Sequence, residues 1–201
     1  MIDASFVDVP GQHNTRSENQ RIKDGQIPDG WEQKPAFHRQ KDTDARHTQK
    51  SGERHYGYKN HIKGDPATKL IETWTVTDAS VHDSQALPGL ISEDADQDTI
   101  LYADSACRSA VTELVLEQHE IESQAHERPW RNTPLTGAQK ASNQEKSRLR
   151  ARVEHIFGSQ SAHGSDLTRT IGKARAWFQI GPGNLLHNLC RFSLLQSRAA
   201  V

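Results

Sequence analysis

The sequence predicts an α/β fold in which helices flank a mixed sheet. Short alternating or apolar runs, typical of strands, are interleaved with longer segments whose apolar residues recur at helical spacing. The expected order is three strands, a helix, a strand, a helix, a strand and a long helix, with a second amphipathic helix near the end. Such alternation is typical of α/β domains. The length of 201 residues fits one domain, or one domain with a small appendage.

The first strand is expected at residues 2–9. Its sequence alternates, and Asp3 lies on the side opposite Ile2 and Phe6. Residues 10–54 are polar and show no clear period. Because a connection this long is unusual inside a compact domain, we expect it to be either functional or flexible.

A β-hairpin is expected next. Residues 55–62 and 69–77 have strand character, and the GDPA sequence between them supplies turn residues. A short helix follows at 83–91, with Asp83 or Ser84 as its N-cap.

The second half of the chain is expected to alternate strands and helices. On the long helix, Leu149, Val153 and Ile156 share one face, which predicts that this face packs against the sheet. The expected elements are a buried strand at 99–103, a helix at 108–118, a weaker strand at 120–125, and helices at 138–157 and 184–196.

Composition excludes several classes of protein. The hydrophobic fraction is 33% and the mean hydropathy is -0.82. No segment approaches the roughly 18 apolar residues of a membrane span, and no apolar secretion signal is visible, so we expect a cytoplasmic protein without a membrane partner. Two cysteines, Cys107 and Cys190, are too few for a disulfide scaffold or a four-cysteine zinc site, and we expect free thiols.

Charge is distributed unevenly behind the net value of -1. Residues 77–125 carry 11 acidic residues and one basic residue, Arg108, whereas residues 126–176 carry 10 basic and 4 acidic residues. This pattern indicates either a polyanion-binding surface beside a carboxylate-rich one, or simply solvated faces.

Three carboxylates stand out by position. Asp3 lies in the first strand, Asp104 ends the apolar strand, and Glu154 lies on the long basic helix one turn after Arg150. If the three converge, their oxygens suit Mg²⁺, and a pair of such ions supports phosphodiester chemistry. The alternatives are a capping role for Asp104 and a salt bridge between Arg150 and Glu154.

Seven sequence blocks occur in order between residue 2 and about residue 195. They are IDAS (2–5), HYGYKNHI (55–62), VTDASVHDSQAL (76–87), YADSACRS (102–109), RARVEHIFG (150–158), RTIGKARA (169–176) and NLLHNLCR (184–191). Together they resemble bacterial insertion-sequence transposases of the DDE class, in the group commonly numbered five within the larger group numbered four.

This resemblance implies a ribonuclease-H-like fold and Mg²⁺-dependent cleavage and strand transfer of DNA, with Mn²⁺ as a substitute metal. Asp3, Asp104 and Glu154 match the catalytic, metal-binding acids of the family, and Arg150 matches the arginine before the glutamate. The implied organisation is a catalytic domain at 1–158, with 10–54 as an insertion, and a helical extension at 159–201.

The implied partner is double-stranded DNA, both the element ends and the target, bound by a homo-oligomer. Neutralising DNA phosphates requires cations, and these gather on the long helix. The expected DNA-binding residues are Lys140, Lys146, Arg148, Arg150 and Arg152, with Lys59, His61 and Arg108 as further candidates beside the catalytic strands.

The sequence departs from the family pattern at its start. Family members carry a helical region before the first catalytic strand, whereas here Met1 directly precedes Ile2. We therefore expect a companion chain to supply that region, and we do not expect this chain to transpose DNA by itself. The alternative is a truncated, inactive remnant that only binds DNA.

Three further departures concern single positions. Cys107 stands where the family usually has an aromatic residue, and we expect it to be a small buried substitute. Ser161 replaces the basic residue expected seven positions after Glu154. Pro182 and Gly183 are expected to interrupt the C-terminal helix.

Overall fold

A computed structural model describes residues 1–92, 96–129 and 133–200. Its strands are β1 (Ile2–Asp8), β2 (Arg46–Lys50), β3 (Glu53–Gly64), β4 (Ile71–Asp78), β5 (Ile100–Leu101) and β6 (Glu122–Ser123). Its helices are α1 (Arg16–Lys23), α2 (Pro35–His38), α3 (Asp83–Ala86) continued by the 3-10 turn η1 (Leu87–Gly89), α4 (Ala110–Gln118), α5 (Gly137–Ala162) and α6 (Lys173–Ala199). No helix in the described ranges is both long and apolar enough to span a membrane.

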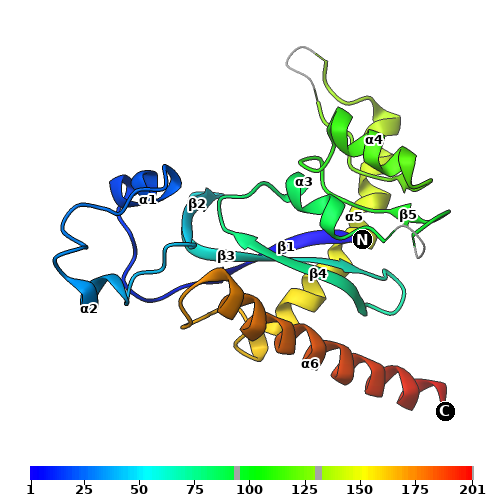
Figure 1. Ribbon diagram of the computed structural model, residues 1–201. Helices are drawn as coiled ribbons and strands as arrows, with labels where there is room; N and C mark the ends of the chain where they lie inside the picture. Colours follow the sequence, from blue (N-terminus) through cyan, green and yellow to red (C-terminus); the bar gives the residue numbers. More distant parts are fainter. Residues whose placement is uncertain (93–95, 130–132, 201) are drawn as a thin grey trace.

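Strand β3 is the centre of the sheet. It pairs antiparallel with β1, β2 and β4, in a register that sets Asp3 opposite Ile62. Strands β5 and β6 form a parallel pair, and a 2.9 Å hydrogen bond from Ile2 N to Tyr102 O joins this pair to β1. Antiparallel and parallel pairing are therefore combined, and the predicted mixed sheet of the ribonuclease-H-like class is confirmed (Figure 1).

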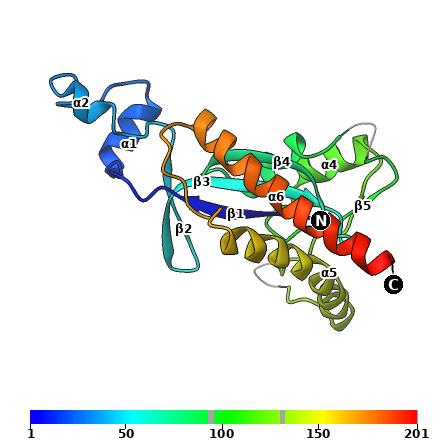
Figure 2. The same ribbon diagram turned by 90° about the horizontal axis from the view of Figure 1, so that it is seen from below.

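Helices α5 and α6 cover one face of the sheet (Figures 1 and 2). Tyr58 packs with Ile180 of α6, and Ile62 packs with Ile156 of α5. Both residues of β3 have even numbers, and side chains two apart point to the same face of a strand. Apolar burial at this spacing fixes the register of β3, because a slip by one residue would turn the whole set away from the helices.

The opposite face is covered by α3, η1 and α4. Ile2 packs there with Leu87, Leu101 and Leu116, all of which are buried. Strand β1 thus contributes to both layers, and Asp3, next to Ile2, faces the α5 side. The alternation predicted for the first strand is confirmed at these two positions.

The polar segment 10–54 is an ordered lobe that contains α1, α2 and β2 (Figure 1). Its anchor is Asp42, which is 3% exposed. The Asp42 carboxylate accepts hydrogen bonds from Tyr58 Oη at 2.7 Å and from the backbone N–H of Gly172 at 3.0 Å. Burial, followed by the bond to Asp42, raises the pKa of Tyr58. One carboxylate therefore ties the lobe to β3 and to the start of α6.

The C-terminal helix differs from expectation, because α6 continues through Pro182. Proline removes one helical N–H, yet tertiary bonds hold the helix on both sides. Before the proline, Ile180 is buried in the core, and after it Asn188 bonds both the N–H and the C=O of Ile71 at 2.8 Å. Packing supplies most of the stability of a helix in a protein, and here it outweighs the local break.

Two other boundaries also differ from the sequence prediction. Helix α5 extends past residue 157 to Ala162, where the serine-rich sequence gave no apolar period. The N-cap of α3 is His82, whose side chain accepts a bond from Ser84 N, and not Asp83 or Ser84 as predicted. Asp83 instead forms an ion pair with Lys59, which removes its carboxylate from the capping position.

We expect Asp42→Ala to lower the free energy of unfolding by at least about 3 kcal/mol, because it leaves several buried donors without an acceptor. Urea denaturation measures this loss. Asp29→Ala is the matched control, since Asp29 is exposed and its pair with Arg21 lies at the surface. That control should change stability by less than about 0.5 kcal/mol. Equal effects of the two substitutions would show that Asp42 does not anchor the lobe.

Candidate active site

Asp3 lies on β1 and points toward α5. Its Oδ2 accepts a hydrogen bond from Arg150 Nη1 at 2.8 Å, and its Oδ1 accepts one from the Ala4 N–H at 2.8 Å. The side chain is 14% exposed. Burial raises the pKa of Asp3, the Ala4 N–H and the Arg150 guanidinium oppose that rise, and the charge of Asp104 adds to it. Asp3 is thus a largely buried carboxylate whose charge is balanced by Arg150.

Asp104 follows β5, next to the start of β1. Its Oδ1 accepts bonds from Ala106 N at 2.8 Å and Cys107 N at 3.2 Å, so the carboxylate caps a tight turn. The N-cap of α4 is Ser109, whose hydroxyl accepts from Thr112 N. Helix capping by Asp104 is therefore excluded. Strand β5 is shorter than the predicted strand and ends at Leu101, so Asp104 lies in the turn after it and not at the strand end.

The Cys107 thiol lies near several acids at the edge of the sheet where β1 and β5 meet. It is buried with Ala103 and Ala125, which confirms the prediction of a small buried residue, and both cysteines are free thiols. Burial raises the pKa of the Cys107 thiol to about 12, and the charges of Asp104, Asp83 and Asp3 add to the rise. Three carboxylates from β1, the turn after β5 and α3 therefore act on one buried thiol.

Glu154 lies on α5, one turn beyond Arg150, and is exposed. Arg150 bonds Asp3 and so does not form the alternative salt bridge within the helix. Within the described ranges, no three His, Cys, Asp or Glu side chains gather closely enough to hold a metal ion. The structure thus places Asp3 and Asp104 on neighbouring segments at one edge of the sheet and leaves Glu154 on helix α5, outside an assembled triad.

The basic residues of α5 divide into two kinds. Lys146 Nζ donates to Ala125 O at 3.1 Å, and Arg152 Nη1 donates to Pro66 O at 2.7 Å, so both help to hold the fold. Lys140 and Arg148 are exposed. Arg108, outside the helix, pairs with Glu127 at 2.6 Å.

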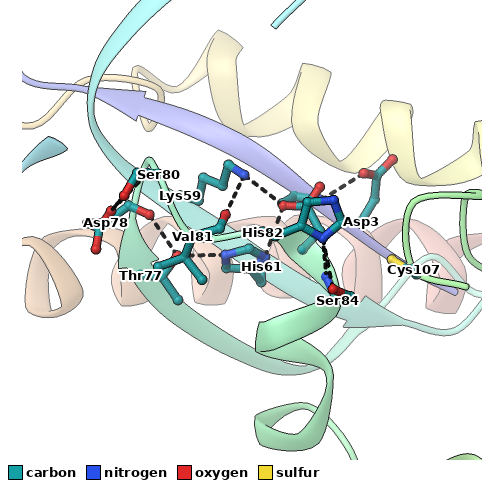
Figure 3. Close-up of polar contacts among 12 residues, drawn as sticks. Asp3, Lys59, His61, Thr77, Asp78, Ser80, Val81, His82, Ser84 and Cys107 are labelled. Atoms are coloured by element: carbon teal, nitrogen blue, oxygen red, sulfur yellow. Dashed lines mark hydrogen bonds and ion pairs between the residues drawn. The ribbon is translucent and has the colours of Figure 1, made fainter. Parts of the chain in front are cut away.

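The side chains of Lys59 and His61 lie on the face of β3 that is turned away from α5 and toward α3 (Figure 3). Lys59 Nζ bonds Asp83 at 2.9 Å and Val81 O at 2.7 Å. His61 bonds the Thr77 hydroxyl at 2.8 Å, and its side chain is 1% exposed. Its burial overturns the expectation that His61 contacts DNA, because a phosphate cannot reach the ring in this conformation.

Asp83 is the residue of this region that the sequence analysis missed. It was considered only as a helix cap, although it lies inside the block VTDASVHDSQAL. It pairs with Lys59, and its charge acts on Cys107. An acid that directly follows a histidine within a family block is the signal that could have found it.

Comparisons with known proteins agree with this fold. Residues 1–189 match the family described as transposase DDE domain. The transposase for insertion sequence element IS1106 of Neisseria meningitidis serogroup B is 31% identical over 159 residues, which cover 79% of this chain and 52% of that protein. No solved structure matches the chain.

The mixed-sheet fold and the family match agree on the class of this chain, a DDE domain. The chain belongs to the transposase DDE-domain family, whose members are transposition enzymes that generally use divalent metal ions. It spans about half the length of the curated relative that it matches.

We expect acid to destabilise the protein through His61. Burial lowers its pKa from 6.5 to about 4, so the unfolded chain binds a proton in that window while the folded chain does not. Stability should therefore fall as the pH falls from 6.5 toward 4. Between pH 7 and pH 5, the wild type should lose about 2 kcal/mol more than His61→Asn. Urea midpoints measure this, with exposed His155→Asn as the control; parallel curves for wild type and His61→Asn would contradict it.

Proposed function

We propose that this chain is the catalytic part of an insertion-sequence transposase of the group numbered five, and that it carries out Mg²⁺-dependent cleavage and strand transfer of DNA. The observation that carries the proposal is that the bond from Ile2 N to Tyr102 O sets the start of β1, with Asp3, beside the segment that leads to Asp104, and that Arg150 of α5 bonds Asp3. In this proposal Glu154, one turn along α5, is the third acid.

The electrostatics of the two aspartates fit a divalent cation. The charge of Asp104 raises the pKa of Asp3 and so disfavours the ionised form of that carboxylate. A cation between them would relieve this repulsion, and carboxylate oxygens are the ligands that Mg²⁺ prefers. Asp3, Asp104 and Glu154 would hold the metal, which would activate an oxygen nucleophile for attack on a phosphodiester. Mn²⁺ can occupy the same kind of oxygen site.

Arg150 has a defined part in this proposal. Its guanidinium neutralises Asp3 at 2.8 Å and keeps that carboxylate directed toward α5. Arginine also forms strong charge-assisted bonds to phosphate, so the same side chain suits the DNA backbone near the acids. A side chain that alternates between a carboxylate and a phosphate would link DNA binding to the state of Asp3.

We propose that DNA contacts α5 at the exposed basic side chains of the helix. Lys140 and Arg148 are exposed, whereas Lys146 and Arg152 bond backbone carbonyls. We assign phosphate contact first to Lys140 and Arg148. The proposed partners are double-stranded DNA at element ends and target, and further copies of the chain.

We expect the chain to nick supercoiled plasmid with Mg²⁺ or Mn²⁺, and EDTA to stop the reaction. Asp104→Asn and Glu154→Gln should each lower the nicking rate by at least about 100-fold, because each removes a proposed metal ligand. Glu145→Gln is the matched control, since Glu145 is an exposed acid on the same helix. Nicking that survives both active-site substitutions would refute the assignment; DNA binding without nicking by the wild type would favour the inactive remnant.

We expect Lys140→Gln/Arg148→Gln to weaken binding to a duplex of about 30 base pairs and to lower the slope of log K against log salt by about 2. Fluorescence anisotropy between 50 and 200 mM salt (roughly the range over which this effect is large) measures both quantities. An unchanged slope would show that these side chains of α5 do not contact DNA phosphates. Circular dichroism should show unaltered helix content, since neither side chain is buried.

A further inference from the structure

A basic groove lies on the lobe, between α1 and β2, and we call it the α1–β2 groove. Its volume is about 670 Å³. Five of the side chains that line it are Arg16, Lys23, Arg46, His47 and Arg54. The remaining lining residues are amides and a hydroxyl, and no acid lines the groove within the described ranges. The groove is therefore a concentration of positive charge surrounded by hydrogen-bonding groups.

Two acids of the lobe, Glu18 and Asp42, are engaged away from the groove cations. Glu18 belongs to α1, but its carboxylate accepts bonds from Trp31 Nε1 at 3.0 Å and Thr15 N at 2.6 Å, and lies 3.7 Å from Lys41 Nζ. Asp42 is buried beneath the lobe. Because these carboxylates are used inside the fold, they do not neutralise the groove cations.

The groove is also held in a fixed shape. Asn14 is buried and donates to Asp42 O at 2.6 Å, and His47 bonds Asn14 O at 2.8 Å. Arg46 Nη1 donates to Thr43 O at 2.6 Å and to Ala45 O at 2.9 Å. The His47 bond ties β2 to the segment before α1, and the Arg46 bonds hold β2 to the turn that precedes it.

The spacing of the cations suits an extended polyanion. Arg16 and Lys23 are the first and last residues of α1, about 10 Å apart along its axis. Arg54 faces them from β3, and Arg16, Lys23 and Arg54 are all exposed. A compact anion would engage one of these positions, whereas a nucleic-acid strand carries charges along its length and can engage several.

We propose that the α1–β2 groove binds the phosphate backbone of duplex DNA, at a position separate from α5. This inference rests on the proposed function, since it adds a second contact for the same substrate. The lobe is inserted between β1 and β3, and β1 carries Asp3, so DNA held by the groove would be connected through one strand to the acids. The groove would contact phosphates and not base edges, so its binding would not depend on base sequence. It would lengthen the stretch of DNA covered by the protein beyond the part that contacts α5.

The test compares three charge-neutralised proteins in anisotropy titrations with a fluorescent duplex of about 30 base pairs. Arg16→Gln/Lys23→Gln/Arg54→Gln removes three exposed groove cations and leaves the structural Arg46 in place. Arg39→Gln/Arg169→Gln/Arg198→Gln removes three exposed cations elsewhere. Lys140→Gln/Arg148→Gln tests α5. The groove variant should lower the salt slope by about 2 to 3, and the matched control by less than about 1.

The outcomes separate the two proposals. Loss of slope in the groove variant but not in its control supports the groove. Equal slopes in those two proteins would overturn it, while a reduced slope in the α5 variant would leave the proposed function standing. Absence of DNA binding by the wild-type chain would overturn the proposed function, and the groove with it. Binding of an acidic peptide, and not DNA, by the groove would also overturn the inference.

Discussion

Strand β3 is the constraint on which the rest of the structure depends. It pairs with three other strands and is covered on both faces, so every layer of the fold is positioned relative to it. Its α5 face is apolar at Tyr58 and Ile62, while its other face carries the charged residues Lys59 and Lys63. Because each charged side chain there finds a carboxylate, the strand can be buried on both sides without leaving a charge unpaired.

Two carboxylates connect other parts of the chain to this sheet. Asp42 connects the lobe to β3 and to the first turn of α6, which lets a polar segment remain ordered with few apolar residues of its own. Asp3 connects β1 to α5 through Arg150. The first carboxylate has its full set of protein donors. The second is balanced by one guanidinium and lies beside another acid, which is the condition expected where a ligand is to bind.

The two proposals assign complementary parts to these regions. The acids at the sheet edge would provide the chemistry, and the cations of α5 would bring the DNA backbone close to them. The α1–β2 groove, which no acid lines within the described residues, would hold the same substrate at a second position. Exposed cations thus gather on α5 and in the groove, while Asp3 and Asp104 lie at the sheet edge, although the net charge of the chain is only -1.

The sequence by itself determined the α/β class, the β3–β4 hairpin, the long helix α5 and the placement of Asp3 on a strand, because periodicity and turn residues are local properties. Family blocks added the expected third acid, Glu154. Only the tertiary structure decided that Arg150 bonds Asp3, that His61 is buried, that α6 continues through Pro182 and that residues 10–54 form an ordered lobe. Each of these depends on contacts between residues far apart in the chain, and such contacts leave no period in the sequence.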